Sequence, residues 1–149
     1  MDIVSSATRS RMMSGIRSAN TRPEKLVRKY LHSIGFRFRL STKQLNCKPD
    51  IILPKYRVAI LVHGCFWHRH ENCKYATTPK SNGEKWARKF TDNLERDLRV
   101  EREIIESGWR VVTIWECWSK RKLDLFWLRE WITLSTEAAI HWPEIDHPS

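Results

Sequence analysis

The distribution of apolar and polar residues along the chain predicts strands and helices in alternation. Apolar runs at residues 50–53 and 58–62 have the length and composition of buried strands. The connection at 54–57 is short, and a short connection between two strands predicts an antiparallel hairpin. Residues 36–40 alternate apolar and basic side chains, as a half-buried strand does, and 109–116 predict a second long strand.

Two stretches have the period of amphipathic helices. Thr21 and Glu24, three residues apart, have the spacing of a capping box, and the apolar residues at 26–34 then fall on one face. Residues 84–107 carry a longer helical pattern that ends before Gly108. The expected apolar stripe of this second helix consists of Trp86, Phe90, Leu94, Leu98 and Ile105.

A strand, a helix and a second strand in this order predict a right-handed crossover between parallel strands. A closing helix is expected at 123–132, and 133–149 is expected to be a polar C-terminal tail. The chain of 149 residues is expected to form one domain, 1–149, since ~150 residues per domain is typical. The predicted fold class is therefore α/β, with a mixed β-sheet flanked by helices.

The composition adds a basic charge to this picture. The 27 Lys and Arg residues outnumber the 17 Asp and Glu residues, for a net charge of +10, and such a surplus favours polyanions such as nucleic acid. Many ordinary domains are also basic, so charge alone does not establish this partner. No apolar stretch is long enough to span a bilayer, and the N-terminus lacks a secretory signal. We therefore expect a cytoplasmic protein with no membrane partner, whose thiols stay reduced.

Residues 1–20 have little apolar periodicity and carry several arginines around Met12 and Met13. Such a segment suits an arm that folds against a phosphate backbone and inserts an apolar side chain into the duplex. A frayed terminus would have the same composition, so both interpretations stay open.

Three potential metal ligands, Cys65, His70 and Cys73, follow the strand at 58–62 closely. Cys117 can join them, because it follows a parallel strand that ends at the same edge of the sheet. Zn²⁺ takes four such sulfur and nitrogen ligands tetrahedrally, and a closed site of this kind is structural. The alternative is a set of unrelated free cysteines in a reducing compartment, as we expect for Cys47.

Pro49-Asp50 at the start of a hairpin resembles the beginning of the PD-(D/E)xK nuclease pattern, in which strand carboxylates hold Mg²⁺ beside a phosphate. The second strand, however, has neither the acid nor the lysine of that pattern. A backbone carbonyl would have to replace the acid, and His63 or His68 the lysine. The competing interpretation is an aspartate that caps a turn.

The two histidines can serve as general bases near neutral pH, and a base of this kind can activate water for attack on phosphorus. Glu24 and Asp97 project from helices that should pack on the sheet, so either could orient a histidine. Glu24 also has the simpler role of a helix cap. A histidine on a loop is otherwise most often only solvated.

Phe66 and Trp67 are adjacent aromatic residues at the exit of a strand. An apolar wedge between base steps costs least at a mismatched pair, so such a wedge would select mispaired sites. Simple packing of both rings on the core is the alternative.

Several of these segments together resemble the very short patch repair (Vsr) endonucleases. The resemblance runs from residue 7 to residue 117 and rests on Ala7-Thr-Arg-Ser10, Pro49-Asp50, His63-Gly-Cys-Phe-Trp-His68, Asn93-Leu-Glu-Arg-Asp97, Gly108-Trp-Arg-Val111 and Trp115-Glu-Cys117. It implies a restriction-endonuclease-like fold with a structural zinc site. It also implies a bacterial, nucleoid-associated, Mg²⁺-dependent enzyme that nicks DNA 5′ of the T in T:G mismatches left by deamination of 5-methylcytosine.

The resemblance also implies roles for individual residues. Asp50 corresponds to the Mg²⁺ ligand, together with the backbone carbonyl of Val62, which stands where relatives often have Thr. His68 corresponds to the general base and His63 to a group that steadies the phosphate. The other implied roles are histidine orienters (Glu24, Asp97), the major-groove wedge (Phe66, Trp67), an arm residue that enters from the other groove (Met13), groove contacts near the mismatch (Lys89, Asn93) and zinc ligands (Cys65, His70, Cys73, Cys117).

These features are compatible with three functions. The leading one is a mismatch-directed nicking endonuclease that acts as a monomer on double-stranded DNA, with a mismatch-repair helper protein as a further partner. A restriction-like enzyme that cuts both strands is the second. A zinc-stabilised DNA-binding module without catalysis is the third.

Overall fold

The centre of the molecule is a four-stranded sheet with the strand order β1-β2-β3-β4. The computed structural model describes residues 20–40 and 42–145. The strands are β1 (Ile51–Leu53), β2 (Val58–His63), β3 (Arg110–Trp115) and β4 (Ala139–Trp142), and the helices are α2 (Arg22–Ser33), α3 (Gly83–Glu106), α4 (Cys117–Lys120) and α5 (Phe126–Leu134). β1 is antiparallel to β2, whereas β2, β3 and β4 are mutually parallel, which confirms the mixed sheet.

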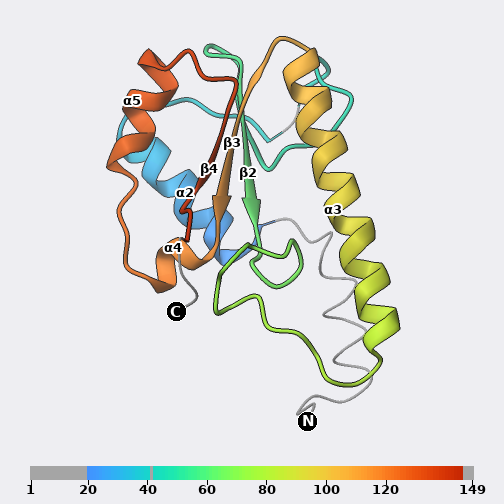
Figure 1. The fold of residues 1–149 in the computed structure, drawn as a ribbon. Helices are drawn as coiled ribbons and strands as arrows, with labels where there is room; N and C mark the ends of the chain where they lie inside the picture. The colour runs from blue at the N-terminus through green and yellow to red at the C-terminus, as the bar shows by residue number, and fades with distance from the viewer. Residues whose placement is uncertain (1–19, 41, 146–149) are drawn as a thin grey trace.

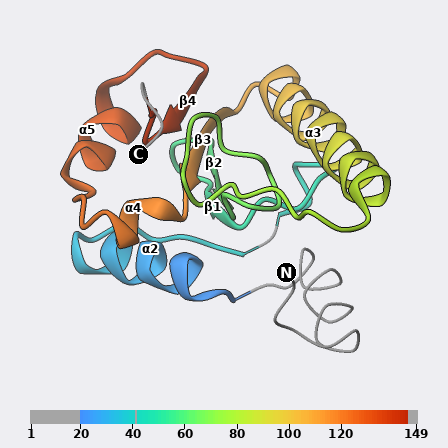
Figure 2. The same ribbon diagram turned by 60° about the horizontal axis from the view of Figure 1, so that its bottom comes forward.

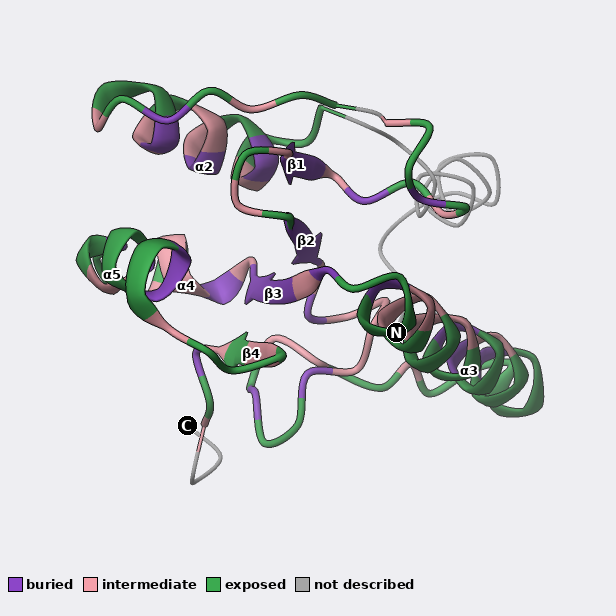
Figure 3. Cartoon of the chain, turned by 90° about the horizontal axis from the view of Figure 1, so that it is seen from above, coloured by how far each residue is buried: buried purple, intermediate pink, exposed green. Residues whose placement is uncertain are grey.

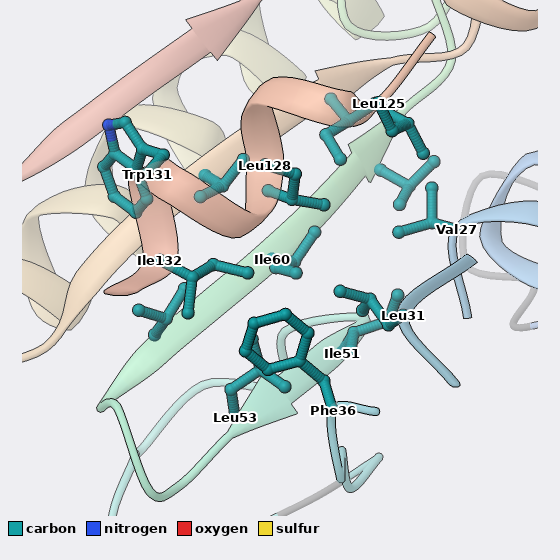
Figure 4. Close-up of a cluster of buried hydrophobic side chains, with 14 residues drawn as sticks. Val27, Leu31, Phe36, Ile51, Leu53, Ile60, Leu125, Leu128, Trp131 and Ile132 are labelled. Carbon is teal, nitrogen blue, oxygen red and sulfur yellow. The ribbon is translucent and has the colours of Figure 1, made fainter. Parts of the chain in front are cut away.

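Helices cover both faces of the sheet. α2 and α5 lie on one face and α3 on the other, as Figures 1 and 3 show from two directions. On the first face, Val27 and Leu31 of α2 and Leu128 of α5 pack against strand residues such as Ile60 (Figure 4). All six residues of β2 are buried, and a fully buried aliphatic side chain contributes ~1.5–3 kcal/mol. β2 is thus a firm support for the residues that follow it.

The apolar stripe expected along α3 is wrong beyond its first two residues. Trp86 and Phe90 are buried, but Leu94, Leu98 and Ile105 are exposed, Leu98 by 62%. Steps of four residues advance about 40° past a full turn each time, so a stripe with this spacing winds off the packed face. The face that meets the molecule alternates steps of four and three residues and consists of Trp86, Phe90, Asn93, Asp97, Val100 and Ile104.

The strand expected at residues 36–40 is not present. Only Arg39 pairs with a strand, through two hydrogen bonds of 2.8 Å with the backbone of Ile52. β1 has three residues, and backbone groups of successive residues point to opposite sides, so only its central residue faces the outer edge. Phe36 is buried all the same, because its ring packs edge-on against Tyr56 at 5.5 Å.

Two expectations about the C-terminal part also need correction. α5 begins three residues later than predicted. Leu123 belongs to the turn before it, because its backbone N–H donates to the carbonyl of Trp118. Residues 133–149 are not simply a polar tail, because they include β4, which pairs in parallel with β3. Its Ile140 and Trp142 pack against the core from this position. A strand of four residues was too short a signal to predict from the sequence.

The segments with candidate chemistry lie at one end of the strands, which is the edge of the sheet referred to below. β2 and β3 end in register, with His63 opposite Trp115, and the antiparallel β1 begins at this edge just after Asp50. In Figure 1 both arrows point toward the loop that follows β2 and toward α4. Within the described residues, no helix is apolar enough over a sufficient length to cross a membrane.

Candidate active site and metal centre

Asp50 is fixed at the edge of the hairpin by a hydrogen bond to the next strand. Its Oδ2 atom accepts the backbone N–H of Val62 at 2.7 Å, so the expected proximity of Asp50 to the end of β2 is confirmed. Burial raises the pKa of Asp50 to about 7; the N–H of Val62 lowers it, while the neighbouring Glu24 raises it. Without a cation, this carboxyl group is therefore partly protonated near neutral pH.

Glu24 lies in the first turn of α2 and is buried. It is both a capping residue and a neighbour of the candidate site. Thr21 Oγ1 accepts the N–H of Glu24 at 3.4 Å, and Glu24 Oε2 accepts the N–H of Asn20 at 2.9 Å. Its side chain also shares a hydrogen bond with Asp50. Among the described residues it has no hydrogen bond to a histidine, because the start of α2 lies against the start of β1. The expectation that Glu24 orients a histidine is not met in this structure.

The two histidines form a stacked pair. The ring centroids of His63 and His68 are 3.9 Å apart and their planes differ by 7°. His68 Nδ1 lies 2.6 Å from Asp97 Oδ2, so Asp97 meets the expectation of a carboxylate on a histidine. An ionised carboxylate only accepts hydrogen bonds, so Nδ1 carries the proton and Nε2 is left as the basic nitrogen.

His63 differs from its partner in being buried. Burial, and then the neighbouring His68, hold the pKa of His63 well below its usual value, so the imidazole is neutral. Its Nδ1 atom has no hydrogen-bond partner among the described residues. The edge of the ring packs against Trp115 at 5.2 Å. His63 is thus a neutral imidazole whose Nδ1 atom is buried and unpaired among the described residues.

A cavity of about 350 Å³ joins these groups. Its lining includes all five of the predicted catalytic residues, Glu24, Asp50, His63, His68 and Asp97. A larger cavity of about 590 Å³ shares His63, His68 and Asp97 with it, but neither Asp50 nor Glu24 lines that cavity. The smaller cavity is the better candidate for phosphate chemistry, because only there does the histidine pair meet Asp50 at the end of β2.

Phe66 and Trp67 lie on the loop after β2 and are half-buried. Phe66 meets Trp86 and Phe90 of α3 edge-on, each at 5.4 Å, and Trp67 at 5.0 Å. Phe66 packs on α3, as the interpretation of core packing expects. Each ring also keeps some exposure, as a wedge would need. Met13, expected as the arm residue that enters from the other groove, lies outside the described residues.

The predicted groove contacts differ in their accessibility. Lys89 on α3 is partly exposed. Asn93 is only 1% exposed, and its Nδ2 donates to the carbonyl of Trp67 at 3.1 Å. In this structure, Asn93 therefore supports the aromatic loop from beneath and does not present its amide to a DNA groove.

Arg69 is a supporting residue that the sequence did not reveal. Its guanidinium donates to the carbonyls of Phe66, Ala76 and Thr77, at 3.3, 3.0 and 2.7 Å, and to Thr78 Oγ1 at 3.0 Å. It also lies 4.2 Å from the centroid of the Phe90 ring. The guanidinium therefore joins both ends of the loop to α3. A single arginine among many in a basic chain gives no signal of this role.

The four expected metal ligands form one cluster. Ligand atoms of Cys65, His70, Cys73 and Cys117 all lie within 4.8 Å of one another, and all four residues are buried. His70 Nδ1 lies 3.6 Å from the sulfur of Cys65 and 3.6 Å from that of Cys117. The set could hold a metal ion with tetrahedral geometry.

Surrounding groups prepare His70 and the thiols for that role. His70 Nε2 lies 2.8 Å from the carbonyl oxygen of Pro143, which can only accept, so Nε2 carries the proton and Nδ1 is free to bind a metal. Trp115 stacks on the imidazole at 4.3 Å. The hydrogen bond that Cys65 and Cys117 share lowers the pKa of Cys117 and raises that of Cys65, so Cys117 is the thiol of this pair that favours the thiolate, the form that binds metals.

Comparison with known proteins points to one family. A family model described as DNA mismatch endonuclease Vsr matches residues 1–74. The type II nicking enzyme V.XorIIP of Xanthomonas oryzae pv. oryzae is 47% identical over 78% of this chain and 85% of its own length. The type II nicking enzyme V.NmeAIP of Neisseria meningitidis serogroup A is 45% identical over 81% of this chain and 86% of its own.

The DNA mismatch endonuclease Vsr of Escherichia coli K12 is 39% identical to this chain over 116 residues, which are 78% of this chain and 74% of the relative. Identity at this level over most of both chains leads to one assignment. The chain belongs to the Vsr family of DNA mismatch endonucleases.

Proposed function

We propose that this protein nicks double-stranded DNA on the 5′ side of the T in a T:G mismatch, by Mg²⁺-dependent hydrolysis of the phosphodiester bond. The observation that carries the proposal is the cavity in which Asp50 and the His68–Asp97 pair lie together at the end of β2. The names of the relatives, mismatch endonuclease and nicking enzyme, favour this reaction over cleavage of both strands. The antiparallel hairpin that carries Asp50 is also consistent with a restriction-endonuclease-like fold.

Asp50 and the carbonyl of Val62 are the proposed Mg²⁺ ligands. The N–H of Val62 points to Asp50, and the N–H and C=O of one strand residue point to the same side, so the carbonyl faces Asp50 as well. Asp50 is a buried carboxyl group beside a second one, Glu24, and a divalent cation would stabilise its ionised form. When bound, Mg²⁺ would polarise the phosphoryl group and offset its charge.

His68 is the proposed general base. Its Nε2 is the basic nitrogen, and it can take a proton from a water molecule as the water attacks phosphorus. Asp97 then stabilises the imidazolium through the Nδ1–H bond of 2.6 Å. The neutral His63, which is stacked on His68 and lines the same cavity, is the residue proposed to steady the phosphate.

Recognition of the mismatch is assigned to Phe66 and Trp67, with Met13 of the arm entering from the opposite groove and Lys89 contacting DNA near the mispair. The rings would enter between base steps, and the unstacking this requires costs least where the pair is already weak. Asn93 and Arg69 would hold the loop in position for that step. Asn93 would reach a groove only if this loop moved.

We assign Zn²⁺ to the cluster of three cysteines and His70, with a purely structural role. All four positions of a tetrahedral ion are filled by protein, so no position is left for substrate. Action as a monomer in the bacterial cytoplasm, association with the nucleoid and help from a mismatch-repair protein stay predictions.

The test is a nicking assay on matched duplexes that contain T:G, T:A or C:G at one position, with and without Mg²⁺. We expect a single nick, only in the T-containing strand of the T:G duplex and only with Mg²⁺. Asp50→Ala should lose nicking but keep DNA binding. Cleavage of both strands of the matched duplexes would support a restriction-like enzyme instead, and binding without any cleavage would support a DNA-binding module.

A further inference from the structure

A group of three positive charges surrounds the ring of Tyr75, which packs against the buried metal-ligand cluster. Lys120 Nζ lies 4.5 Å from the ring centroid, Lys74 Nζ 5.4 Å and Arg121 Cζ 5.5 Å. Lys74 and Lys120 are exposed to solvent. These four residues are called the Tyr75 patch below.

The charges of the two lysines, Lys74 and Lys120, carry this argument. Among the residues that the structure describes, neither Lys74 nor Lys120 forms an ion pair with a carboxylate. The ring face attracts each cation weakly, but cations gathered around one ring repel one another. Such a site therefore favours an anion, which would relieve that repulsion.

The metal centre holds the patch in place. Tyr75 packs against the buried cluster of Cys65, Cys73, Trp115 and Cys117. Arg121 donates to the sulfur of Cys73 at 3.5 Å, and Lys120 ends α4, which begins at Cys117. The cations come from two segments, the loop after β2 and the region of α4. Each segment contains metal ligands, so the metal centre holds the two segments together.

The patch lies at the same edge of the sheet as the candidate active site. Its loop follows β2, its helix follows β3, and these parallel strands end side by side with His63 opposite Trp115. Figure 2 shows this edge turned toward the viewer, with the loop after β2 next to α4. A long polyanion engaged at the end of β2 can thus extend across both regions.

We propose that the Tyr75 patch binds backbone phosphates of the DNA duplex beside the nicking site. This inference rests on the proposed function and adds a second anchoring surface to it. Phosphate contacts position a protein on DNA without reading its sequence, so the patch should strengthen binding to matched and mismatched duplexes alike. The metal centre would then serve DNA binding as well as folding.

The experiment measures the salt dependence of DNA affinity for the full-length, zinc-loaded protein. Lys74→Gln and Lys120→Gln are made singly and together, and Lys55→Gln is the matched control. Lys55 is also exposed and also lies 5.5 Å from a tyrosine ring, that of Tyr56, but it sits in the β1–β2 turn at the opposite edge of the sheet. The zinc content of each variant is measured so that damage to the metal centre is detected.

Each neutralised phosphate contributes about 0.9 to the slope of log affinity against log salt concentration. We expect the slope to fall by about 0.9 in each single variant and by about 1.8 in the double variant, on T:G and T:A duplexes alike. Lys55→Gln should leave both this slope and the nicking rate unchanged.

Two results would overturn the proposal, and they are distinguishable. A wild-type protein that binds and nicks the T:G duplex, with a double variant of unchanged affinity and slope, excludes the patch alone. A wild-type protein that does not bind DNA at all excludes both the patch and the proposed function.

Discussion

The carboxylate of Asp97, on α3, accepts a hydrogen bond of 2.6 Å from Nδ1 of His68, on the loop after β2. These residues are 29 positions apart, and no backbone pairing links them directly. The contact depends on the buried face of α3 that alternates four and three residues, because Asp97 follows Trp86, Phe90 and Asn93 along that face. Aromatic packing at one end of the helix therefore places the carboxylate on the proposed base.

The first prediction tests this contact. Asp97→Asn should lower the maximal nicking rate by ~10²–10⁴-fold, the usual contribution of a positioned base, because an amide can stabilise the wrong tautomer. DNA affinity should stay the same. Asp92→Asn, an exposed change of the same charge on the same helix, is the control. Equal rates for the two variants would show that Asp97 does not orient the base.

The second prediction concerns pH and Mg²⁺. The pKa of Asp50 is about 7 in the metal-free site, so below this pH a proton competes with the cation for the carboxylate. Nicking at limiting Mg²⁺ should therefore rise with pH through this region. A higher Mg²⁺ concentration should move the rise to lower pH. If the rise of activity with pH occurs at the same pH at all Mg²⁺ concentrations, Asp50 is not the Mg²⁺ ligand.

Glu24→Gln tests the same site from its neighbour. Removing the second carboxylate removes a cause of the raised pKa of Asp50, so that pKa should fall. At one fixed, limiting Mg²⁺ concentration, the rise of activity should then begin at a lower pH than in the wild type. Rate profiles measured between pH 5 and 9 check the direction of this shift.

The third prediction concerns the aromatic loop. Arg69→Ala should reduce discrimination between T:G and T:A duplexes more than it reduces the maximal rate, because the loop that carries Trp67 loses four hydrogen bonds. Trp67→Ala should have the same pattern, since it removes the wedge itself. Arg69→Lys should restore little, because an ammonium group cannot reproduce the planar guanidinium fork. Unchanged discrimination in Arg69→Ala would separate the arginine from recognition.

The fourth prediction concerns the metal. Cys73→Ser should lower the zinc content below one ion per chain and destabilise the fold by ~3 kcal/mol or more, which is ~10 °C in melting temperature for a chain of this size. Cys47→Ser is the control, because Cys47 is a free cysteine outside the cluster. Added Mg²⁺ alone should not restore a chelated protein, whereas Zn²⁺ with Mg²⁺ should. Full stability in Cys73→Ser would contradict a structural metal.

The sequence predicted the elements that local patterns determine. The β1–β2 hairpin, the crossover through α3 and the four clustered metal ligands follow from runs, spacing and the rule that parallel strands end together. It could not predict which face of α3 is packed, because several helical stripes contain apolar residues and tertiary contacts choose between them. β4 was missed since four residues beside a parallel partner carry too little periodicity.

Within the candidate site, the sequence predicted which residues lie together better than it predicted which of them form hydrogen bonds with one another. Asp97 meets His68 as expected, but Glu24 meets Asp50, because the start of α2 lies beside β1. Asn93 and Arg69 hold the aromatic loop through bonds to backbone carbonyls. Every residue has a carbonyl, so a sequence gives no sign of which one a distant side chain will find.

The bond from His70 Nε2 to the carbonyl of Pro143 has a further consequence, because Pro143 comes directly after β4. A metal ion on Nδ1 would keep the proton on Nε2, where it is donated to the Pro143 carbonyl. Metal binding would therefore also hold the edge strand β4 in the sheet. Depleting the ion should therefore loosen residues 139–145 first. Their amide hydrogens would exchange, and proteases would cut there, well before the hairpin at the opposite border of the sheet opens.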